Sequence, residues 1–223
     1  MFRIFPGVQW KAEVIPLRKI FSVLLLLTGL FLILWPVLTS RCNSCLQHQA
    51  LDTYRQAVSR LDKPTCTRLL EAVEAANDAA LLAVDSSGII GSVAVPGLQI
   101  CLPIYIGTSE SALAAGAGLW EGGSLPIGGA GRHMVLSAHR GLPEARMFRN
   151  LDQMQPGDTF TVTVLDRVLT YQVVQILEAV PSDVLALLPR EGEDLCTLVT
   201  CTPYGINSHR LLVQGQRISV PAL

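Results

Sequence analysis

The chain has 223 residues, of which 50% are hydrophobic and 16% are charged, and its formal net charge at pH 7 is −1. This length fits one domain with a smaller appendage. Because no basic cluster is interleaved with aromatic residues, the composition argues against a nucleic-acid partner. Much of the hydrophobic excess lies in one stretch near the N-terminus.

That stretch, residues 20–39, contains no charged side chain, and about 20 such residues are enough to cross a bilayer as a helix. Basic residues are more frequent before the stretch than after it, which places the N-terminus in the cytoplasm by the positive-inside rule. A cleaved signal peptide is the alternative, although the apolar run is longer than a typical signal core and no clear Ala-x-Ala site follows it. The flanking basic residues are Arg3, Lys11, Arg18, Lys19 and Arg41.

The predicted organisation has a cytoplasmic N-terminus (1–19), a transmembrane anchor (20–39), an extracytoplasmic helical appendage (40–88) and a catalytic domain (89–223). Within the appendage, apolar residues at spacings of three and four predict one helix over 51–61 and another over about 65–83. Asp62-Lys63-Pro64 separates the two helices, because proline restricts the residue before it and lacks an amide donor. The chain ends soon after its last predicted strand, so we expect residues 20–39 to provide any membrane anchoring.

From residue 89 onward, short β-prone runs alternate with turn residues, which predicts an antiparallel barrel or sandwich. Three connections, 109–118, 143–152 and 182–188, have helical character. The glycines between 122 and 131 lack both the Lys-Ser/Thr of a P-loop and the order of a dinucleotide motif, so we interpret them as a tight-turning loop. The predicted strands are 91–95, 98–106, 133–138, 159–164, 170–177, 195–200 and 210–214.

The six cysteines indicate no metal site or cofactor. Cys42 and Cys45 have CxxC spacing, but the chain has neither a second such pair for zinc nor a redox context around this one. We interpret them as membrane-proximal thiols or a local disulfide, and pairing with Cys66 is left open. Cys101 and Cys196 lie in apolar runs and are expected to be small buried hydrophobes.

The segment 197–213 has apolar, β-prone residues on both sides of a Pro-Tyr-Gly-Ile-Asn turn. As a hairpin, it sets Cys201 and Arg210 on neighbouring strands. The thiolate is the nucleophilic form of cysteine, and a nearby cation stabilises it. The spacing therefore suggests an activated nucleophile.

Among the four histidines, His139 is the best candidate to act with this thiol, because it follows a predicted strand at the point where the chain leaves the sheet. It lies 62 positions before Cys201 (201 − 139), so only tertiary structure could bring the two together. The other histidines are interpreted as unremarkable: His48 on the surface, His133 solvated, and His209 on the face opposite Arg210 by strand alternation.

Leu198-Val199-Thr200-Cys201 resembles the Leu-x-Thr-Cys signature of sortases, the cysteine transpeptidases of Gram-positive cell surfaces. The longer run 197–215 is similar to the pilus-assembling class C branch of that family. Two further blocks agree: Leu102-Pro103-Ile104-Tyr105 with Gly107-Thr108, and the block from Ser124 to Gly129 followed by Leu136 to Pro143. The match covers residues 89–217 in the family's order, and the chain is identified as a member.

The resemblance implies a mainly β fold, an eight-stranded antiparallel β-barrel with short helices, here preceded by a transmembrane helix and the helical appendage. It assigns the nucleophile to Cys201, the general acid/base to His139, and stabilisation of the oxyanion or substrate to Arg210. It implies no cofactor and no metal. Arg140 and Arg217 are less favoured cations, and the residues that could shape the pocket are Ser137, Thr200 and Tyr204.

The implied reaction is cleavage of an LPxTG-type sorting signal between Thr and Gly and transfer of the acyl group to a pilin lysine. The implied partners are pilins or surface proteins with such a signal, and the cell membrane. One alternative attaches single proteins to peptidoglycan through a precursor amine, and another is an inactive binding module. Class C relatives often carry an Asp-Pro-aromatic lid, whereas Asp62-Lys63-Pro64 lacks the aromatic residue, so we expect the lid to be absent or differently built.

Overall fold

The computed structural model describes residues 17–140 and 147–219. It divides into two compact units, residues 1–38 and residues 39–223. Several predictions fall outside the described part: residues 1–16 of the cytoplasmic segment, 143–146 of a helical connection, the side chain of Cys42 and the chain end at 220–223. The four predicted segment boundaries therefore remain predictions.

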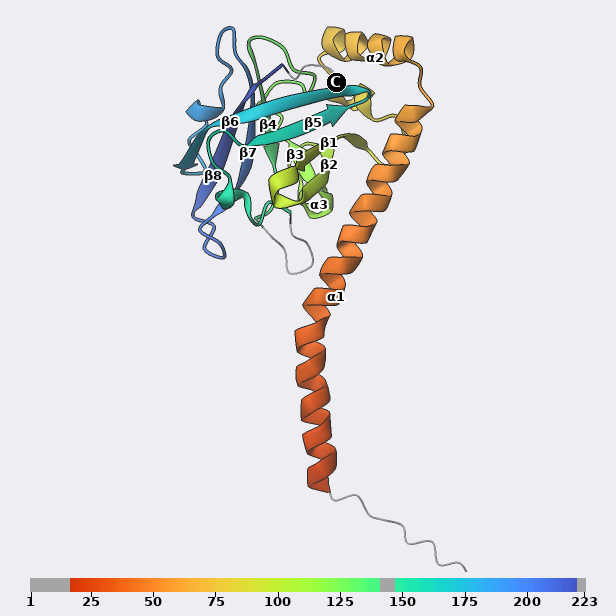
Figure 1. The fold of residues 1–223 in the computed structure, drawn as a ribbon, viewed down its shortest axis with the longest axis vertical. Helices are drawn as coiled ribbons and strands as arrows, with labels where there is room; N and C mark the ends of the chain where they lie inside the picture. The colour runs from red at the N-terminus through yellow and green to blue at the C-terminus, as the bar shows by residue number, and fades with distance from the viewer. Residues whose placement is uncertain (1–16, 141–146, 220–223) are drawn as a thin grey trace, which may run out of the picture. The chain divides into compact units, whose positions relative to one another are not determined.

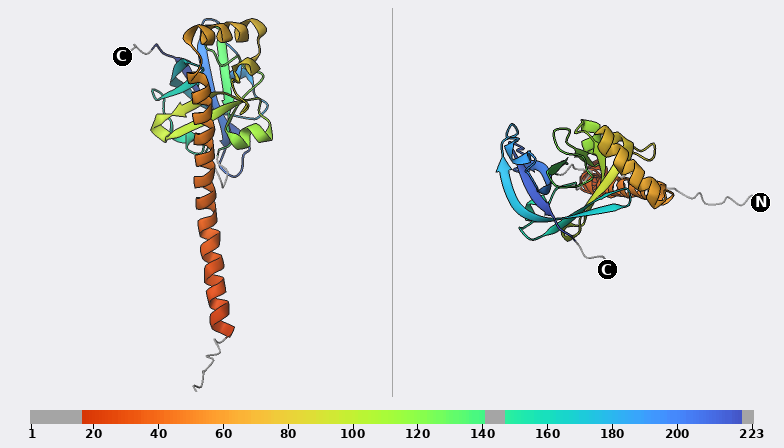
Figure 2. Two further views of the ribbon diagram at one scale, coloured as in Figure 1. Left: turned by 90° about the vertical axis from the view of Figure 1, so that its right-hand side faces the viewer. Right: turned by 90° about the horizontal axis from the view of Figure 1, so that it is seen from above.

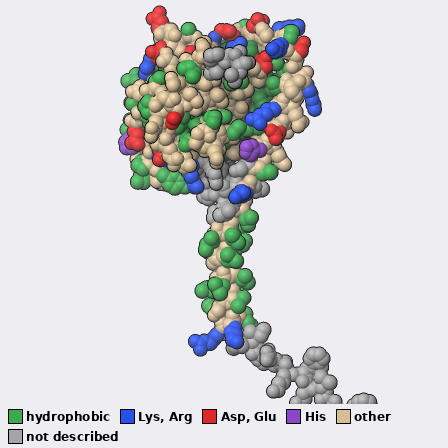
Figure 3. Space-filling model, viewed as in Figure 1, with side chains coloured by type: hydrophobic (Ala, Val, Ile, Leu, Met, Phe, Trp, Pro, Cys, Tyr) green, Lys and Arg blue, Asp and Glu red, His purple; other side chains and the backbone are tan. Residues whose placement is uncertain are grey.

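The first helix, α1 (Leu17–Ser59), contains the apolar stretch. Its window Arg18–Trp35 has a mean hydropathy of 1.9 and no buried share, so this helix is long and apolar enough to cross a membrane. Hydrophobic side chains line this part of α1 (Figure 3), and Phe21 and Leu26 are each more than 70% exposed. Water is a poor solvent for such a surface, so the composition fits a bilayer, although the orientation across it stays a prediction.

The C-terminal part of α1, from residue 39 onward, belongs to the second unit and packs on the barrel. Tyr54 is buried, and its hydroxyl donates to the carbonyl of Ile90 (3.2 Å) and accepts from the amide of Leu165 (3.3 Å). Burial is the main cause that raises the pKa of Tyr54 to about 12. The Tyr54 side chain therefore attaches the helix to two separate segments of the barrel.

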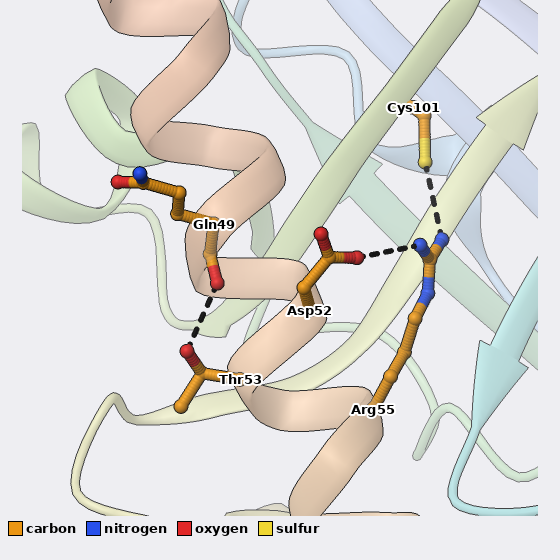
Figure 4. Close-up of polar contacts among 5 residues, drawn as sticks. All are labelled: Gln49, Asp52, Thr53, Arg55 and Cys101. Atoms are coloured by element: carbon orange, nitrogen blue, oxygen red, sulfur yellow. Dashed lines mark hydrogen bonds and ion pairs between the residues drawn. The ribbon is translucent and has the colours of Figure 1, made fainter.

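A second contact joins α1 to the strand that carries Cys101. Figure 4 shows the Arg55 guanidinium between the Asp52 carboxylate and the Cys101 sulfur. The nitrogen–oxygen distance is 3.3 Å and the nitrogen–sulfur distance is 3.8 Å. The hydroxyl of Thr53 donates to the carbonyl of Gln49 one turn earlier. Arg55 and Asp52 are both more than half exposed, so this pair adds little stability and mainly orients the helix.

Helix α2 (Lys63–Ala76) follows the predicted break. The carboxylate of Asp62 accepts the amide of Thr65 at 3.2 Å, and Pro64 lies in the first turn, so Asp62-Lys63-Pro64 is a helix cap. The predicted helix over 65–83 ends earlier than expected, because Asn77 adopts a left-handed conformation with φ 51°. A short 3-10 helix, η1 (Ala79–Leu82), completes that region.

Eight strands close into a barrel in the order β1-β2-β3-β4-β7-β8-β6-β5 (Figures 1 and 2), which confirms the predicted eight-stranded fold. In the described residues six of its eight pairings are antiparallel, whereas β2 with β3 and β4 with β7 are parallel. The strands are β1 (Ile89–Val95), β2 (Ile100–Ile106), β3 (Ala117–Leu119), β4 (Arg132–Ser137), β5 (Thr159–Val164), β6 (Arg167–Ala179), β7 (Asp194–Thr202) and β8 (His209–Arg217).

Strand β3 corrects the prediction of helical character over 109–118. Helix α3 (Glu110–Ala115) occupies the first part of that range, and β3 follows it directly. A side chain at Gly118 would bring its Cβ into collision with the carbonyl oxygen of Gly107. The close approach of two backbones requires glycine there, and a strand of only three residues is too short for an alternation that could predict it.

Three further connections contain a short 3-10 turn. They are η2 (Pro96–Leu98), η3 (Leu151–Gln153) and η4 (Leu185–Leu187). Turn η4 lies within the predicted range 182–188, and η3 overlaps the end of the predicted range 143–152. The glycine-rich loop 120–131 contains no helix and leads into β4, as predicted, and the amide of Gly129 donates to the Asp194 carboxylate at 2.7 Å.

Two apolar clusters lie on opposite faces of the same strands. The larger fills the barrel interior and includes Met134 and Leu136 of β4. The smaller consists of Val135, Leu187, Val199 and Leu212, on the outer face where the β6–β7 connection (residues 180–193) folds over the sheet. Because side chains alternate along a strand, the outer face of β4, β7 and β8 is a second, independent packing surface.

Candidate active site

The hairpin of β7 and β8 places Cys201 and Arg210 directly opposite each other in the antiparallel ladder. The turn between them is closed by the amides of Ile206 and Asn207, which both donate to the carbonyl of Pro203. Directly opposed residues project their side chains on the same face, with Cβ atoms about 5 Å apart. The thiol and the guanidinium therefore start from neighbouring positions on one face.

His139 approaches this pair through a different strand. Strand β4 runs parallel to β7 with a constant offset of 62 residues, from Arg132 beside Asp194 to Ser137 beside Val199. The contact continues beyond the strand, because the hydroxyl of Thr200 donates to the carbonyl of Ala138 at 2.9 Å. The same offset carries His139 to the level of Cys201 (139 + 62 = 201).

The predicted nucleophile, acid/base and cation therefore lie at one end of three adjacent strands. The outer face has successive rows in which Thr197 pairs with Gln214, Val199 with Leu212, and Cys201 with Arg210. The carbonyl of His139 accepts the amide of Phe148 at 3.0 Å, which holds the backbone where the chain leaves the sheet. Cys201, His139 and Arg210 are all half-buried, so they are accessible from the surface.

Arg140 is engaged in contacts with β7 and with η3. Its Nη1 donates to the Thr202 hydroxyl at 2.7 Å and to the Cys201 carbonyl at 3.4 Å, and its Nη2 lies 2.8 Å from the Asp152 carboxylate. Its side chain is 11% exposed. Because Nη1 and Nη2 are engaged in these contacts, Arg140 is a weaker candidate than Arg210 for the predicted cation.

Arg217, the other less favoured cation, lies far from Cys201. It lies seven residues beyond Arg210 on β8, which at roughly 3.3 Å per residue separates them by about 23 Å. Its guanidinium lies 3.8 Å from the Asp194 carboxylate and over the ring of Tyr171. It serves the opposite end of the barrel.

A pocket of about 280 Å³ opens beside Arg210 on the outer face. Its floor is apolar and is formed by Val135, Val199 and Leu212, and its outer wall comes from the β6–β7 connection. The guanidinium of Arg210 donates to the carbonyls of Asn207 and His209 at 3.2 and 3.1 Å from one nitrogen, so its other donors face no acceptor among the described residues. The lining residues are Thr108, Leu113, Trp120, Val135, Ser137, Ala179, Val180, Pro181, Asp183, Val184, Leu187, Val199, Arg210 and Leu212.

The three residues expected to shape the pocket have different positions. Ser137 lines the pocket, whereas Thr200 is buried and contacts Ala138. Tyr204 lies exposed on the β7–β8 turn, where its hydroxyl accepts from Arg149 at 3.2 Å and its ring stacks under the same guanidinium. This contact ties the turn to the segment that follows His139.

The prediction that His133 is solvated is wrong. Its side chain is fully buried, with Nδ1 3.0 Å from the carbonyl oxygen of Leu188 and Nε2 2.7 Å from the hydroxyl of Thr197. Burial is the main cause that lowers its pKa. His133 shares one face of β4 with the apolar residue Val135, and this pattern could have indicated that the face is buried. The loop that covers the face, however, lies 55 residues away in the sequence.

Five cysteines, Cys45, Cys66, Cys101, Cys196 and Cys201, are free thiols. Cys196 is fully buried, as predicted, and burial raises the pKa of its thiol. Cys101 is only partly buried, because β2 turns it outward toward Arg55. His48 and His209 are both exposed.

Comparison with known proteins identifies the family. A family model described as the sortase domain matches residues 93–218, which is more than half of the chain. The protein belongs to the sortase family. The fold and the Leu-x-Thr-Cys block thus have one common explanation.

Solved structures resemble this sortase over most of its length. Sortase C of Streptococcus pneumoniae is 44% identical with a TM-score of 0.70, and the match covers 78% of this chain and 99% of that one. Sortase C1 of Streptococcus agalactiae is 38% identical with a TM-score of 0.71, over 77% and 99% of the two chains. A curated relative, sortase A of Listeria monocytogenes, is 22% identical over 90% of this chain and 91% of its own length. The predicted similarity to the class C branch is confirmed.

Proposed function

We propose that this sortase is a membrane-anchored cysteine transpeptidase that joins pilin subunits. It cleaves an LPxTG-type sorting signal between Thr and Gly and transfers the acyl group to a pilin lysine. The pairing of Cys201 with Arg210, at the level that β4 gives to His139, carries this proposal. The similarity to sortase C structures, one of which concerns pilin substrate specificity, supports the pilin substrate.

In the first step the Cys201 sulfur attacks the threonine carbonyl carbon. The carbon–nitrogen bond to glycine breaks, and His139 donates a proton to the leaving amine. A thioester between Cys201 and threonine remains. Arg210, a permanent cation with several donors, stabilises the negative oxygen of the tetrahedral intermediate or holds the substrate backbone.

In the second step a lysine amine attacks the thioester. The amine loses a proton to His139, the carbon–sulfur bond breaks, and the new isopeptide bond joins the two proteins. Cys201 returns to its starting state. Because the amine, and not water, completes the cycle, the reaction is a transfer and consumes no cofactor.

The pocket next to Arg210 fits the apolar part of such a signal. Its floor of Val135, Val199 and Leu212 offers no charged group to the substrate. Apolar side chains upstream of the cleaved bond would lie there and place the threonine carbonyl near Cys201. Burial of these side chains supplies affinity. Arg210, which lines the same pocket, would then lie close to the threonine carbonyl.

The proposed location is the cell membrane. The helix that contains residues 18–35 would cross it once, with the N-terminus in the cytoplasm and the barrel outside. Both the sorting signal and the acceptor lysine are expected on that outer side.

Attachment of single proteins to peptidoglycan is a second candidate, and the sortase A relatives favour it. They are 22% and 26% identical to this chain, whereas the sortase C structures are 38% and 44% identical. The higher identity favours a lysine acceptor over a precursor amine. A barrel that binds the signal without turnover is the non-enzymatic possibility.

The deciding experiment incubates the full chain in detergent with a pilin-like protein that carries an LPxTG-type tail. A ladder of covalent multimers supports polymerisation. Adducts with a peptidoglycan-type amine and no ladder would move the function to wall anchoring. Mass spectrometry of the intact protein detects a thioester on Cys201. Peptide binding without this thioester would support the non-enzymatic binding module.

A further inference from the structure

A buried polar cluster on the outer face of the barrel lies apart from the row of Cys201 and Arg210. It consists of His133 on β4, Thr197 on β7 and Gln214 on β8, which are 0%, 0% and 2% exposed. Val199 and Leu212, the floor of the pocket, lie between this cluster and the row of Cys201 and Arg210. The proposed reaction uses none of the three polar side chains.

In the part of the chain that the structure describes, the side-chain hydrogen bonds that leave the cluster go to one segment, the β6–β7 connection. The side-chain nitrogen Nε2 of Gln214 donates to the carbonyl of Ala186 at 3.2 Å. His133 Nδ1 donates to the carbonyl of Leu188 at 3.0 Å, and its Nε2 accepts the Thr197 hydroxyl at 2.7 Å. A neutral imidazole can satisfy both of these contacts at once.

The two held carbonyls flank Leu187, which is the buried residue of η4. The Leu187 side chain packs against Val135, Val199 and Leu212 in the smaller apolar cluster. It also lines the pocket beside Arg210. The connection is therefore attached at three consecutive residues, by two hydrogen bonds and one apolar side chain. The same segment supplies the outer wall of the pocket between residues 180 and 187.

Two buried donors of the cluster, His133 Nδ1 and Gln214 Nε2, keep their acceptors only while the connection stays in place. If the wall moved away, His133 and Gln214 would lose their carbonyl acceptors, and the Gln214 oxygen already has no partner among the described residues. Buried donors without acceptors are costly, which favours the closed position. The width of the pocket is thus coupled to side chains that do not touch it.

We propose that His133, Thr197 and Gln214 are positioning residues that set the wall of the pocket and thereby the affinity for the apolar part of the sorting peptide, without taking part in the chemical step. This inference rests on the proposed function, because it assumes that the pocket binds the peptide. It predicts an effect on KM that is separate from kcat.

The test compares Thr197→Val and Gln214→Met with the matched control Thr197→Ser in the full chain in detergent. Valine has the shape of threonine without the hydroxyl, serine keeps the hydroxyl, and methionine keeps the length of glutamine without its donor. We expect Thr197→Val and Gln214→Met to raise KM for an LPxTG-type peptide about tenfold, the effect of one lost hydrogen bond, with kcat within about twofold. Thr197→Ser should stay near the wild type.

Two further measurements separate the outcomes. Hydrogen exchange at residues 180–188 should become faster in the two disrupting variants, and the rate of Cys201 alkylation by iodoacetamide, followed by mass spectrometry, should not change. Faster exchange with unchanged KM would overturn the inference, as would unchanged exchange, or a loss of kcat and alkylation at constant KM. If the wild type forms no peptide adduct, the proposed function fails, while the exchange measurement still decides whether the cluster holds the loop.

Discussion

Cys201 and Arg210 are direct partners in the antiparallel ladder between β7 and β8. A tight turn of six residues, 203–208, separates the strands that carry them. Their relative position therefore depends on local backbone geometry, and it does not require long-range packing. Because the backbone sets this position, a substitution of one side chain should leave the position of the other unchanged, and each can be tested separately.

Replacing Cys201 by alanine should abolish both the peptide adduct and the ligation product. Loss of the nucleophile removes the covalent route, so we expect turnover to fall by at least about 1000-fold. Mass spectrometry of the intact protein measures the adduct. Cys45→Ala is the matched control, because Cys45 is an exposed free thiol outside the barrel, and it should react like the wild type; ligation by Cys201→Ala would refute the mechanism.

Arg210→Ala should lower kcat about 100- to 1000-fold with little change in the melting temperature, because it removes donors from the oxyanion and leaves no buried partner. Arg210→Lys should recover only part of this loss, since a point charge cannot reproduce the planar set of donors. Single-turnover rates and thermal denaturation measure the two effects.

Arg140→Ala should behave in the opposite way. It leaves the Thr202 hydroxyl and the half-exposed Asp152 carboxylate without a donor, which costs about 1–3 kcal/mol. At roughly 2–4 °C per kcal/mol, the melting temperature should fall by several degrees. A variant with unchanged melting temperature but a kcat as low as that of Arg210→Ala would show that the roles of the two arginines are reversed.

Stability should fall as the pH drops below about 6.5, the ordinary pKa of histidine, in part because of His133. Burial lowers the pKa of His133 in the folded protein, so in this range the unfolded chain binds a proton that the folded chain does not. The contribution is fully present above the unfolded pKa and is lost as the pH falls toward the folded one. Urea midpoints at pH 7.5 and 5.5 should differ less in His133→Gln than in the wild type, whereas the exposed His209→Gln should keep the full difference.

Tyr54→Phe should weaken the attachment of α1 to the barrel. The change removes the hydroxyl between the Ile90 carbonyl and the Leu165 amide, at a cost of about 1–3 kcal/mol for buried groups left unpaired. Thermal denaturation should show a loss of several degrees. Tyr105→Phe is the control, since no hydrogen bond of its hydroxyl is found in the described residues; equal losses in both variants would argue against a specific role for the Tyr54 hydroxyl.

Local patterns predicted the parts of the fold that depend on neighbouring residues. The β7–β8 hairpin, the helix break at Asp62-Lys63-Pro64 and the apolar helix near the N-terminus are all formed by residues close together in the chain. Strand β3 was not predictable in this way, because it depends on two neighbouring strands. The early end of α2 does have a local signal, Asn77, which the prediction of a helix to residue 83 did not use.

The sequence by itself determined the family, the transmembrane-length helix and the identity of the thiol and cation that face each other across one turn. Turn chemistry and alternation act over a few residues and leave a readable pattern. Only the tertiary structure decided that His139 lies at the level of Cys201, because the parallel pairing of β4 with β7 joins strands 62 residues apart. It also decided that His133 is buried, since the covering loop belongs to a distant segment and no local periodicity records which loop folds over which face.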